Sequence, residues 1–369
     1  MPSSVPLRPQ AMTGLDRDTH GTHVAAARPL KLIYHGTLWE GSTSLQRLAA
    51  FRGLPDVTVV ANDTGARMGQ GATFFKRIRW KLRWPTDDMN ENANIVGVVN
   101  RERPDAVLFD NSRVITRTTL RQLRQLGVKT LAYYTPDDVM GAHNLSWPLR
   151  LSFPEWDVFF TTKTFNVPEL AAHGVRHPVL IGKSYDPVLH RPLSPAEVGE
   201  DYERYDLVFI GAWERERMRS INALGSAGLK VVVYGGTLGR WDAKDIHPAI
   251  NVKPAVFGEA YTRAMHHGKI ALCFLRKLNR DRITQRTMEI AAIGRPMLAE
   301  KTDEHDAHFV DGIEYVGFTT DADLVAKARG LLADPARRAA IAAQGRERCL
   351  RSHYSAPDRA RTMVEALTA

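Results

Sequence analysis

Short apolar segments alternate with helical patterns along almost the whole chain, and this alternation constrains the fold more than any other feature. The segments in the first half are 30–36, 57–61, 105–110, 129–134, 157–162 and 177–182. Those in the second half are 206–211, 230–235, 269–275, 296–300 and 314–318. Several of the intervening helical patterns stop at glycine, as helix C-termini often do. Strands that alternate with helices favour parallel sheets, so the sequence predicts an α/β protein.

The length of 369 residues suits about two domains. Segment 184–205 interrupts the alternation with prolines and charges and has no apolar period, so we interpret it as a linker. We therefore expect one Rossmann-like domain over 30–183 and a second over 206–354, facing each other across a cleft. Residues 1–29 lack the apolar core of a secretion signal, and we expect them to form a disordered tail.

Composition narrows the classes of function. Two cysteines, Cys273 and Cys349, give no disulfide framework, and no apolar run approaches the ~18 residues that span a bilayer. We therefore expect a cytoplasmic, reducing location. The net charge of +9 suits a phosphate-bearing substrate, an anionic membrane or a nucleic acid. No nucleic-acid-binding motif stands out, so we expect no nucleic acid partner.

The strongest functional signal lies in 269–300. An apolar strand pattern is followed by a polar loop, by a helix from about Thr284 to Gly294, and by a second strand pattern. Such a loop lies at the carboxyl end of its strand, where open parallel sheets bind ligands. Asp281 and Glu289 supply carboxylates for sugar hydroxyls, and arginines beside the helix N-terminus favour phosphate. Both groups together indicate a nucleotide-sugar.

The segments GKIALCFLRKLNRDRITQRTMEIAAIGRPMLAE and HFVDGIEYVGFTTDADLVAKARGLLADPARRAAIAAQGRERCLRSHYS resemble the C-terminal domain of GT-B glycosyltransferases. The resemblance is to the CgeB-like (spore maturation) branch of the group-1, or family-four, enzymes. It covers residues 206–369 well, and RERPDAVLFDNS and AYYTPDD match more loosely. It implies the GT-B fold, a nucleoside diphosphate sugar bound by the second domain, and an acceptor hydroxyl bound by the first. It also implies that 355–369 forms a helix that crosses back to the first domain.

Family-four enzymes place two acids eight positions apart, the later one on the ribose and the earlier one facing the donor sugar. In this register Glu289 would bind the ribose and Asp281 would face the sugar. Aspartate at the first position is one methylene shorter than the family's glutamate, which alters the geometry at the sugar. The alternative for Glu289 is a solvated helix residue. Its apolar neighbours Met288 and Ile290 favour a buried position instead.

Cations for the diphosphate have two candidate sources. Arg286 and Thr287 lie in the first turn of the same helix, where a guanidinium and backbone N–H groups can hold a diphosphate and stabilise it as leaving group. The alternative for Arg286 is an ion pair with one of the two acids. Arg215 and Arg217 begin the helix after 206–211, with Arg217 preferred. Interleaved glutamates make a solvated helix face the alternative there.

Other loop residues complete the predicted donor side. Gly211, Gly235 and Gly236 follow strand patterns and permit close backbone approach to a ligand, although a plain turn explains them equally well. Phe257 is a candidate for stacking on the nucleobase, and a core position is its alternative. The neighbouring arginines Arg280 and Arg282 are interpreted as surface charges.

Acceptor-side candidates come from the first half. Gly36 and Gly41 suit a loop that approaches substrate after the first strand pattern. Asp137 and Asp138 end another strand pattern and would bind acceptor hydroxyls or act as a base, unless they merely cap the next segment. His143 is a further possible base. A retaining enzyme, which the two-acid spacing favours, needs no such base; an inverting enzyme does.

We expect neither a cofactor nor a metal ion, because guanidinium groups and a helix N-terminus already offset the diphosphate charge. The acidic pair at 137–138 also offers fewer oxygens than a hard cation usually collects. Alternative functions are a nucleotide-sugar epimerase, a phosphorylase, or a non-catalytic nucleotide- or nucleic-acid-binding protein.

Segment 74–84, FFKRIRWKLRW, mixes aromatic and cationic side chains. One interpretation is an interfacial helix that gives the protein a peripheral contact with anionic membrane. The interpretation we prefer from sequence is a surface helix that packs one apolar stripe on the sheet and leaves its arginines in solvent.

Overall fold

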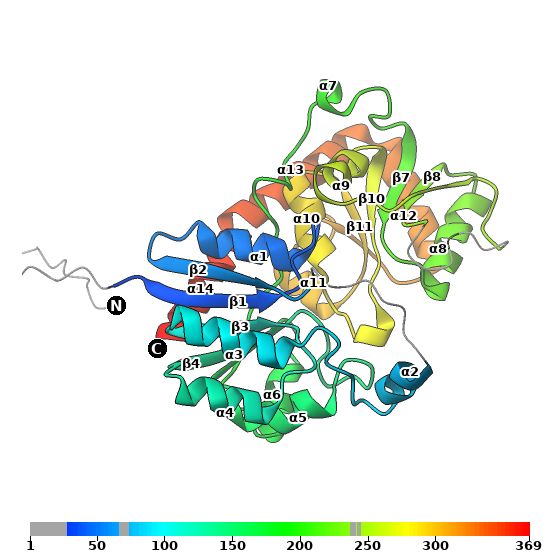
Figure 1. Ribbon diagram of the computed structural model, residues 1–369. Coiled ribbons are helices and arrows are strands. Elements are labelled where there is room, and N and C mark those ends of the chain that lie inside the picture. The colour runs from blue at the N-terminus through cyan, green and yellow to red at the C-terminus, as the bar shows by residue number, and fades with distance from the viewer. Residues whose placement is uncertain (1–27, 66–73, 237–240, 242–244) are drawn as a thin grey trace, which may run out of the picture.

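The computed structural model describes residues 28–65, 74–236, 241 and 245–369, so nearly all of the expected tail lies outside the described residues. Two parallel sheets of six strands each form the centre of the molecule, and helices flank both (Figure 1). The α/β prediction is confirmed, and every apolar segment predicted as a strand forms one.

The first sheet has the strand order β2-β1-β3-β4-β5-β6. Its strands are β1 (Leu30–Gly36), β2 (Val57–Asp63), β3 (Ala106–Asp110), β4 (Thr130–Thr135), β5 (Val158–Thr161) and β6 (Pro178–Leu180). The accompanying helices are α1 (Thr43–Arg52), α2 (Phe74–Lys81), α3 (Glu91–Glu102), α4 (Arg117–Gln125), α5 (Trp147–Ser152) and α6 (Asn166–Ala172). Figure 1 shows α2 at the periphery, away from this sheet.

The second sheet has the order β12-β11-β10-β7-β8-β9. Its strands are β7 (Tyr205–Ile210), β8 (Val231–Tyr234), β9 (Ile250–Lys253), β10 (Gly268–Cys273), β11 (Met297–Glu300) and β12 (Val316–Phe318). Its helices are α8 (Arg215–Ser226), α9 (Gly258–Met265), α10 (Gln285–Ile293), α11 (Asp303–His308), α12 (Asp321–Ala333) and α13 (Pro335–Arg351). The sequence analysis missed β9, a short edge strand whose asparagine and lysine hide its apolar alternation.

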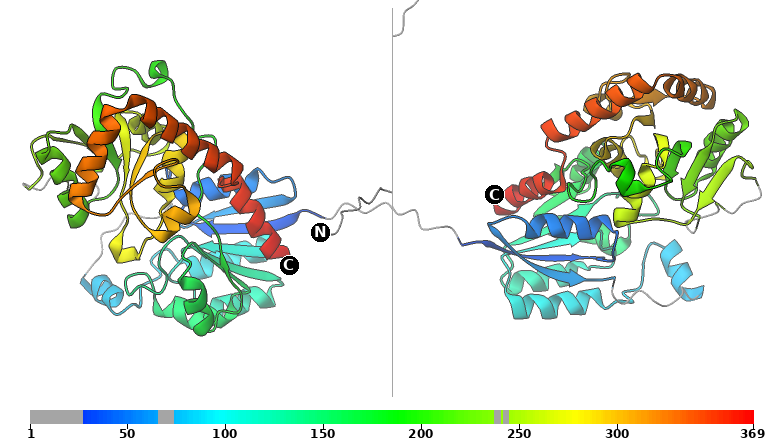
Figure 2. Two further views of the ribbon diagram at one scale, coloured as in Figure 1. Left: turned by 180° about the vertical axis from the view of Figure 1, so that it is seen from behind. Right: turned by 90° about the horizontal axis from the view of Figure 1, so that it is seen from above.

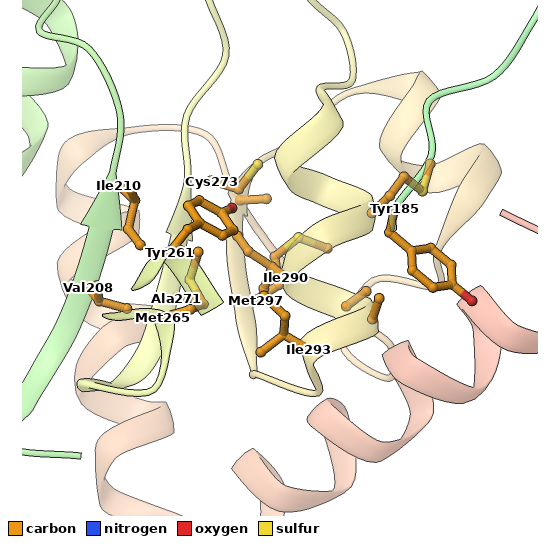
Figure 3. Close-up of a cluster of buried hydrophobic side chains, with 14 of the residues drawn as sticks. Tyr185, Val208, Ile210, Tyr261, Met265, Ala271, Cys273, Ile290, Ile293 and Met297 are labelled. Atoms are coloured by element: carbon orange, nitrogen blue, oxygen red, sulfur yellow. The ribbon is translucent and has the colours of Figure 1, made fainter. Parts of the chain in front are cut away.

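Helix α10 illustrates why these residues form these elements. Thr284 caps its N-terminus, and Gly294 ends it in the left-handed conformation, with φ of 74°, which glycine adopts at little cost. Ile290 and Ile293 belong to the cluster that fills the space between α10 and the sheet (Figure 3). Burying each such side chain stabilises the fold by about 1.5–3 kcal/mol. The same packing fixes the helix N-terminus at the carboxyl end of β10.

The chain crosses between the two domains twice, and the crossings touch. The first passes through Tyr185 and continues into the short helix α7 (Pro195–Val198); the second precedes α14 (Ala356–Thr368). The Tyr185 N–H donates to the Tyr354 carbonyl at 3.2 Å. Helix α14 then packs on the first domain, where its apolar face joins the core around Phe51 (Figure 2). Closure or opening of the domains would therefore bend both crossings together.

Among the described residues, no helix is long and apolar enough to span a bilayer.

Candidate active site

A cavity of about 380 Å³ lies between the two domains, at the carboxyl ends of strands from both sheets. This edge is where parallel sheets present ligand-binding loops. The second domain lines the cavity mainly with residues after β7, before α9, and around the start of α10. The first domain adds residues from the start of α1 and the end of β4. The predicted residues that line the cavity are Gly41, Asp137, Gly211, Arg217, Phe257, Asp281, Arg286 and Glu289.

Two arginines, Arg217, which is buried, and Arg286, which is half-buried, form the cationic part of the cavity. Arg217, in the first turn of α8, and Arg286, in the first turn of α10, lie with their guanidinium carbons 5.8 and 5.6 Å from the centroid of the Phe209 ring. Arg217 donates to the Ala212 carbonyl at 3.1 Å. The Nε atoms of both arginines are buried and have no hydrogen-bond partner within the described part of the chain. Unsatisfied buried donors of this kind are costly, and an anion would satisfy them.

The electrostatics of the pair favour a bound anion. Burial lowers the pKa of Arg217; Glu214 opposes that effect and the neighbouring Arg286 adds to it. Burial also acts to lower the pKa of Arg286, but Tyr261 and then Glu289 outweigh it, so this pKa is raised. The cavity thus holds two desolvated cations near each other. A diphosphate would relieve both their desolvation and their repulsion.

Glu289 lies one turn into α10, and only 8% of the residue is exposed. Its carboxylate accepts a hydrogen bond of 2.6 Å from the Tyr261 hydroxyl. Burial, and then the nearby carboxylate, raise the pKa of Tyr261 well above its usual value, so this hydroxyl stays a donor. The tyrosine holds one face of the carboxylate and so orients Glu289 toward the cavity, where it has the chemistry to accept hydrogen bonds from vicinal hydroxyls.

Asp281 meets a partner from the other domain. Lys163, which follows β5, forms a buried ion pair with the Asp281 carboxylate, and the side-chain amide of Asn279 donates to the same oxygen at 2.8 Å. The side chains of Asp281 and Lys163 are 9% and 2% exposed. The acid predicted to face the donor sugar is therefore oriented by a lysine of the first domain. This pair also ties the loop after β10 to the domain opposite.

Lys183 and Asp137 line the first-domain side of the cavity. The Lys183 ammonium donates to the Pro136 carbonyl at 2.8 Å. Burial, and then the neighbouring Lys163, lower the pKa of Lys183 to about 7, against the attraction of Asp281 and Asp137. Asp137 keeps a side chain that is 28% exposed, so it is accessible to an acceptor hydroxyl. Of the three predicted bases, Asp137 is the one that lines this cavity.

Asp138 has a different environment from Asp137. Arg280 of the second domain donates to both of its carboxylate oxygens, at 2.6 and 2.7 Å, and to Glu169. Against the effect of burial, Arg280 and Asn166 hold the pKa of Asp138 below its usual value. With its side chain 2% exposed and both oxygens occupied, Asp138 locks the two domains together and has no free oxygen for a base. Arg280 itself is exposed, with 46% of its side chain in solvent, so it is a surface charge as interpreted, and it pairs across the domain boundary.

The remaining predicted residues do not line this cavity. His143 lines a second cavity near α2, and Arg215 is exposed on α8. The side chain of Thr287 is buried against His305 and Cys273, and its N–H donates to the Thr284 carbonyl. Neither the side chain nor the N–H of Thr287 is available to a diphosphate.

Of the predicted glycines, some pack against the protein's own chain and others line the cavity. A Cβ on Gly235 would lie 2.1 Å from the Gly211 carbonyl oxygen, and one on Gly236 would lie 3.1 Å from the Lys253 carbonyl oxygen. A Cβ on Gly36 would meet the side chains of Asp110 and Ser44. These three glycines make room for the protein's own chain and not for a ligand. Gly41, with φ of 88°, lies at the cavity directly against Phe257.

Aromatic side chains from both domains meet at the cavity. Phe257 lines it, is 44% exposed and stands edge-on to Trp39 of the first domain, with ring centroids 5.0 Å apart. The Phe257 side chain is therefore not part of the core, and a flat ring such as a nucleobase has an aromatic surface to stack against.

Sequence reasoning missed several residues of this site. Lys183 was assigned only as the end of a domain, and Lys163, Arg276 and Gln46 were not considered. Arg276 and Gln46 line the cavity, and Lys163 pairs with Asp281. The only local signal was that Lys163 and Lys183 each follow a strand of a parallel sheet, the position where ligand-binding residues gather.

Similar architecture occurs in solved structures that share only 10–14% sequence identity with this chain. HepE from Anabaena, in complex with UDP and glucose, is 12% identical with a TM-score of 0.64, covering 92% of this chain and 99% of that one. Sucrose-phosphate synthase from Thermosynechococcus elongatus is 12% identical with a TM-score of 0.61, covering 92% and 98%. A putative UDP-N-acetylglucosamine 2-epimerase from Listeria monocytogenes is 14% identical with a TM-score of 0.58, covering 92% and 96%.

The chain therefore has the GT-B fold of glycosyltransferases. Within that class, residues 214–365 match the model of a family described as glycosyl transferase-like. The matched range contains Arg217, Asp281, Arg286 and Glu289. A search of curated protein sequences gave no match.

Proposed function

We propose that this protein is a glycosyltransferase that transfers a sugar from a nucleoside diphosphate sugar to an acceptor hydroxyl. The observation that carries the proposal is the arginine pair, Arg217 and Arg286, in the interdomain cavity that also holds Glu289. The Nε atoms of both are buried and lack partners among the described residues. The family match over 214–365 and the UDP and UDP-glucose complexes of HepE support the same ligand class.

The two arginines and the N-terminus of α10 would hold the diphosphate, and Glu289 the ribose. During transfer, the bond between the sugar C1 and the β-phosphate oxygen breaks, and a bond forms between C1 and the acceptor oxygen. Negative charge develops on the departing diphosphate, beside Arg217 and Arg286. Cations fixed in place before the reaction stabilise this charge without reorganising, which lowers the barrier.

We propose that the reaction retains the anomeric configuration, with the acceptor proton passing to an oxygen of the departing phosphate. The support is the spacing of Asp281 and Glu289, since both line the same cavity. Asp281, held by Lys163, would face the donor sugar. NMR of the first-formed product gives its anomeric configuration. Inversion would reject retention and assign the base role to Asp137.

We propose further that the reaction needs no divalent metal, because the two arginines already face the diphosphate position. Turnover is then expected to survive excess chelator. Loss of turnover in chelator with recovery in magnesium would reject this part of the proposal while leaving the donor class intact.

We also propose a cytoplasmic protein that contacts anionic membrane through 74–84. In α2 no side chain is buried: Phe74 is 72% exposed and Ile78 39%, and Leu82 just beyond it 64%. The prediction that one stripe packs on the sheet is therefore wrong. Exposed aromatic rings interleaved with Arg77, Arg79 and Lys81 match the apolar and anionic layers of a bilayer surface.

The test of the main proposal is a donor screen. The protein is incubated with nucleoside diphosphate sugars and a panel of hydroxyl acceptors, and release of nucleoside diphosphate is measured together with the product mass. Wild type is expected to release diphosphate and form a glycoside, and Arg286→Ala to bind donor but turn over slowly. If neither wild type nor the variant releases nucleoside diphosphate while the donor binds tightly, a non-catalytic binding protein is favoured.

An epimerase of the nucleotide-sugar is the second candidate, because the Listeria monocytogenes structure, described as a putative UDP-N-acetylglucosamine 2-epimerase, shares this architecture. An epimerase would change the sugar while it acts on the donor alone, without an acceptor. Conversion of a nucleotide-sugar into its epimer in the absence of acceptor would therefore select this function.

A further inference from the structure

A second cavity of about 320 Å³ lies between the end of α2 and the loop 142–146 in the first domain. Its lining includes the cations Lys81, Arg83 and Arg113, together with the indole of Trp80 and the imidazole of His143, and contains no acidic residue. Neither Lys81 nor Arg83 has an acidic partner in the described ranges of the chain. A concave site with this lining attracts an anion.

Arg113 connects this cavity to the interdomain one. Its guanidinium donates to the His143 carbonyl at 3.0 Å and to the Asn144 side chain at 2.8 Å, and lies 5.5 Å from the Trp80 ring centroid. One of its nitrogens is also 4.0 Å from the carboxylate of Asp137, which lines the interdomain cavity. The two cavities therefore lie on either side of a single ion pair, at the acceptor side of the cleft.

His143 adds an observation that is independent of the charge. Its Nε2 atom is buried and has no hydrogen-bond partner among the described residues. The loop 142–146 is held in place by Arg113 and by Asn144, whose amide donates to the Asp138 carbonyl at 2.9 Å. The loop held by these bonds thus keeps an unsatisfied imidazole nitrogen beside a cationic cavity, where an anion or its hydroxyl would satisfy it.

We propose that this second cavity binds a phosphate group carried by the acceptor, and thereby places an acceptor hydroxyl at Asp137 in the cleft. The inference rests on the proposed function, which supplies the donor sugar. Guanidinium and ammonium groups match phosphate by charge and hydrogen-bond geometry. The exposed indole of Trp80 supplies a surface for the apolar or sugar part of the same molecule.

The phosphate has two possible sources, a soluble phosphate ester and a lipid headgroup at the bilayer that α2 would contact. Both present the same chemistry to Lys81 and Arg83. The variants that distinguish the cavity from the surrounding surface lie in the same segment, 74–84. Lys81→Gln with Arg83→Gln removes two charges from the cavity. Arg77→Gln with Arg79→Gln removes two charges from exposed positions that do not line it.

Glycerol 3-phosphate is titrated calorimetrically into the full-length protein in saturating UDP, so that the interdomain cavity is filled. Wild type and the Arg77/Arg79 control are expected to bind it alike. The Lys81/Arg83 variant is expected to bind about tenfold more weakly or worse, the effect of losing charge-assisted hydrogen bonds. No binding to wild type, or equal weakening in both variants, would overturn the proposal.

Sedimentation with phosphatidylcholine vesicles, with and without phosphatidylglycerol, identifies the source. A larger loss of vesicle binding in the Lys81/Arg83 variant than in the control assigns the cavity to a lipid headgroup. Equal losses, together with selective loss of glycerol 3-phosphate binding, assign it to a soluble ester. Failure of UDP, GDP and ADP alike to bind would reject the proposed donor site, while the glycerol 3-phosphate titration repeated without nucleotide would still test the cavity.

Discussion

Replacing Arg217 with alanine separates a ligand-binding role from a structural one. A structural arginine stabilises the fold, so its loss lowers stability. A buried arginine that serves to bind an anion lowers the stability of the protein without the anion, because the cation is desolvated. Binding of the anion offsets that loss. The variant Arg217→Ala is therefore expected to lose affinity for nucleoside diphosphate while its stability changes little.

The structure sets the magnitudes. Truncation removes one hydrogen bond, to the Ala212 carbonyl, one cation–π contact with Phe209, and an ion pair of 3.8 Å with the partly exposed Glu214, together worth about 1–2.5 kcal/mol. It also removes repulsion from Arg286. The two guanidinium carbons are no more than about 11 Å apart, given their distances to the ring, so the repulsion is at least about 1.5 kcal/mol at an effective dielectric constant of about 20. The net change in stability is therefore within about 1 kcal/mol.

The loss of affinity is expected to be larger. One charge-assisted hydrogen bond to a phosphate contributes about 1.5–3 kcal/mol, which corresponds to a roughly 10- to 150-fold increase in Kd. Isothermal titration calorimetry with UDP, GDP and ADP measures Kd, and urea unfolding measures stability. Arg215→Ala is the matched control, because it removes the same charge from an exposed position on the same helix.

Two results would refute the reasoning. Loss of several kcal/mol of stability in Arg217→Ala would make the arginine structural. Equal loss of affinity in the Arg215→Ala control would mean that only the general positive potential of α8 matters, and that the buried geometry around Phe209 does not.

Three further predictions follow from the same geometry. Glu289→Gln is expected to weaken nucleoside diphosphate binding roughly 10- to 150-fold by calorimetry, because a neutral amide accepts ribose hydroxyls less strongly; unchanged Kd would remove the residue from the site. Because the pKa of Lys183 falls from 10.5 to about 7 on folding, the unfolded state binds more protons between these values. The unfolding free energy of wild type relative to Lys183→Met should therefore rise with pH from about 7 to 10.5, and a flat difference would contradict the buried position. Arg280→Ala should destabilise the protein by about 1–2 kcal/mol and enlarge its radius of gyration, because it removes the ion pairs that Asp138 and Glu169 make with the second domain. The control Arg282→Ala, which loses only its pair with Asp303 in its own domain, should do neither.

The alternation of apolar and helical segments was sufficient to predict the parallel sheets, because strand and helix periodicities are local properties of the chain. The same local information located the loop after β10 and the start of α10. Asp281, Arg286 and Glu289 follow from that location, because a residue just beyond a parallel strand must lie at the sheet edge where ligands bind.

The ion-pair partners of the charged side chains could not be predicted from such local information. Asp137 and Asp138 are neighbours in sequence and look equivalent there. Arg280, 142 positions away, binds Asp138, whereas Asp137 lines the cavity. Lys163 and Asp281 meet across 118 positions. These pairings depend on how the two domains pack.

The sequence by itself therefore determined the fold class and the strand ends at which a site had to form. Only the tertiary structure decided which cations line the interdomain cavity and which pair with acids of the opposite domain. Gly235 is a further example, because its role could not be read from the sequence. A side chain there would collide with the carbonyl of Gly211, which the pairing of β7 with β8 brings beside it. The physical reason is range: backbone preferences act over a few residues, whereas burial and charge pairing depend on whatever the folded chain brings within a few ångströms.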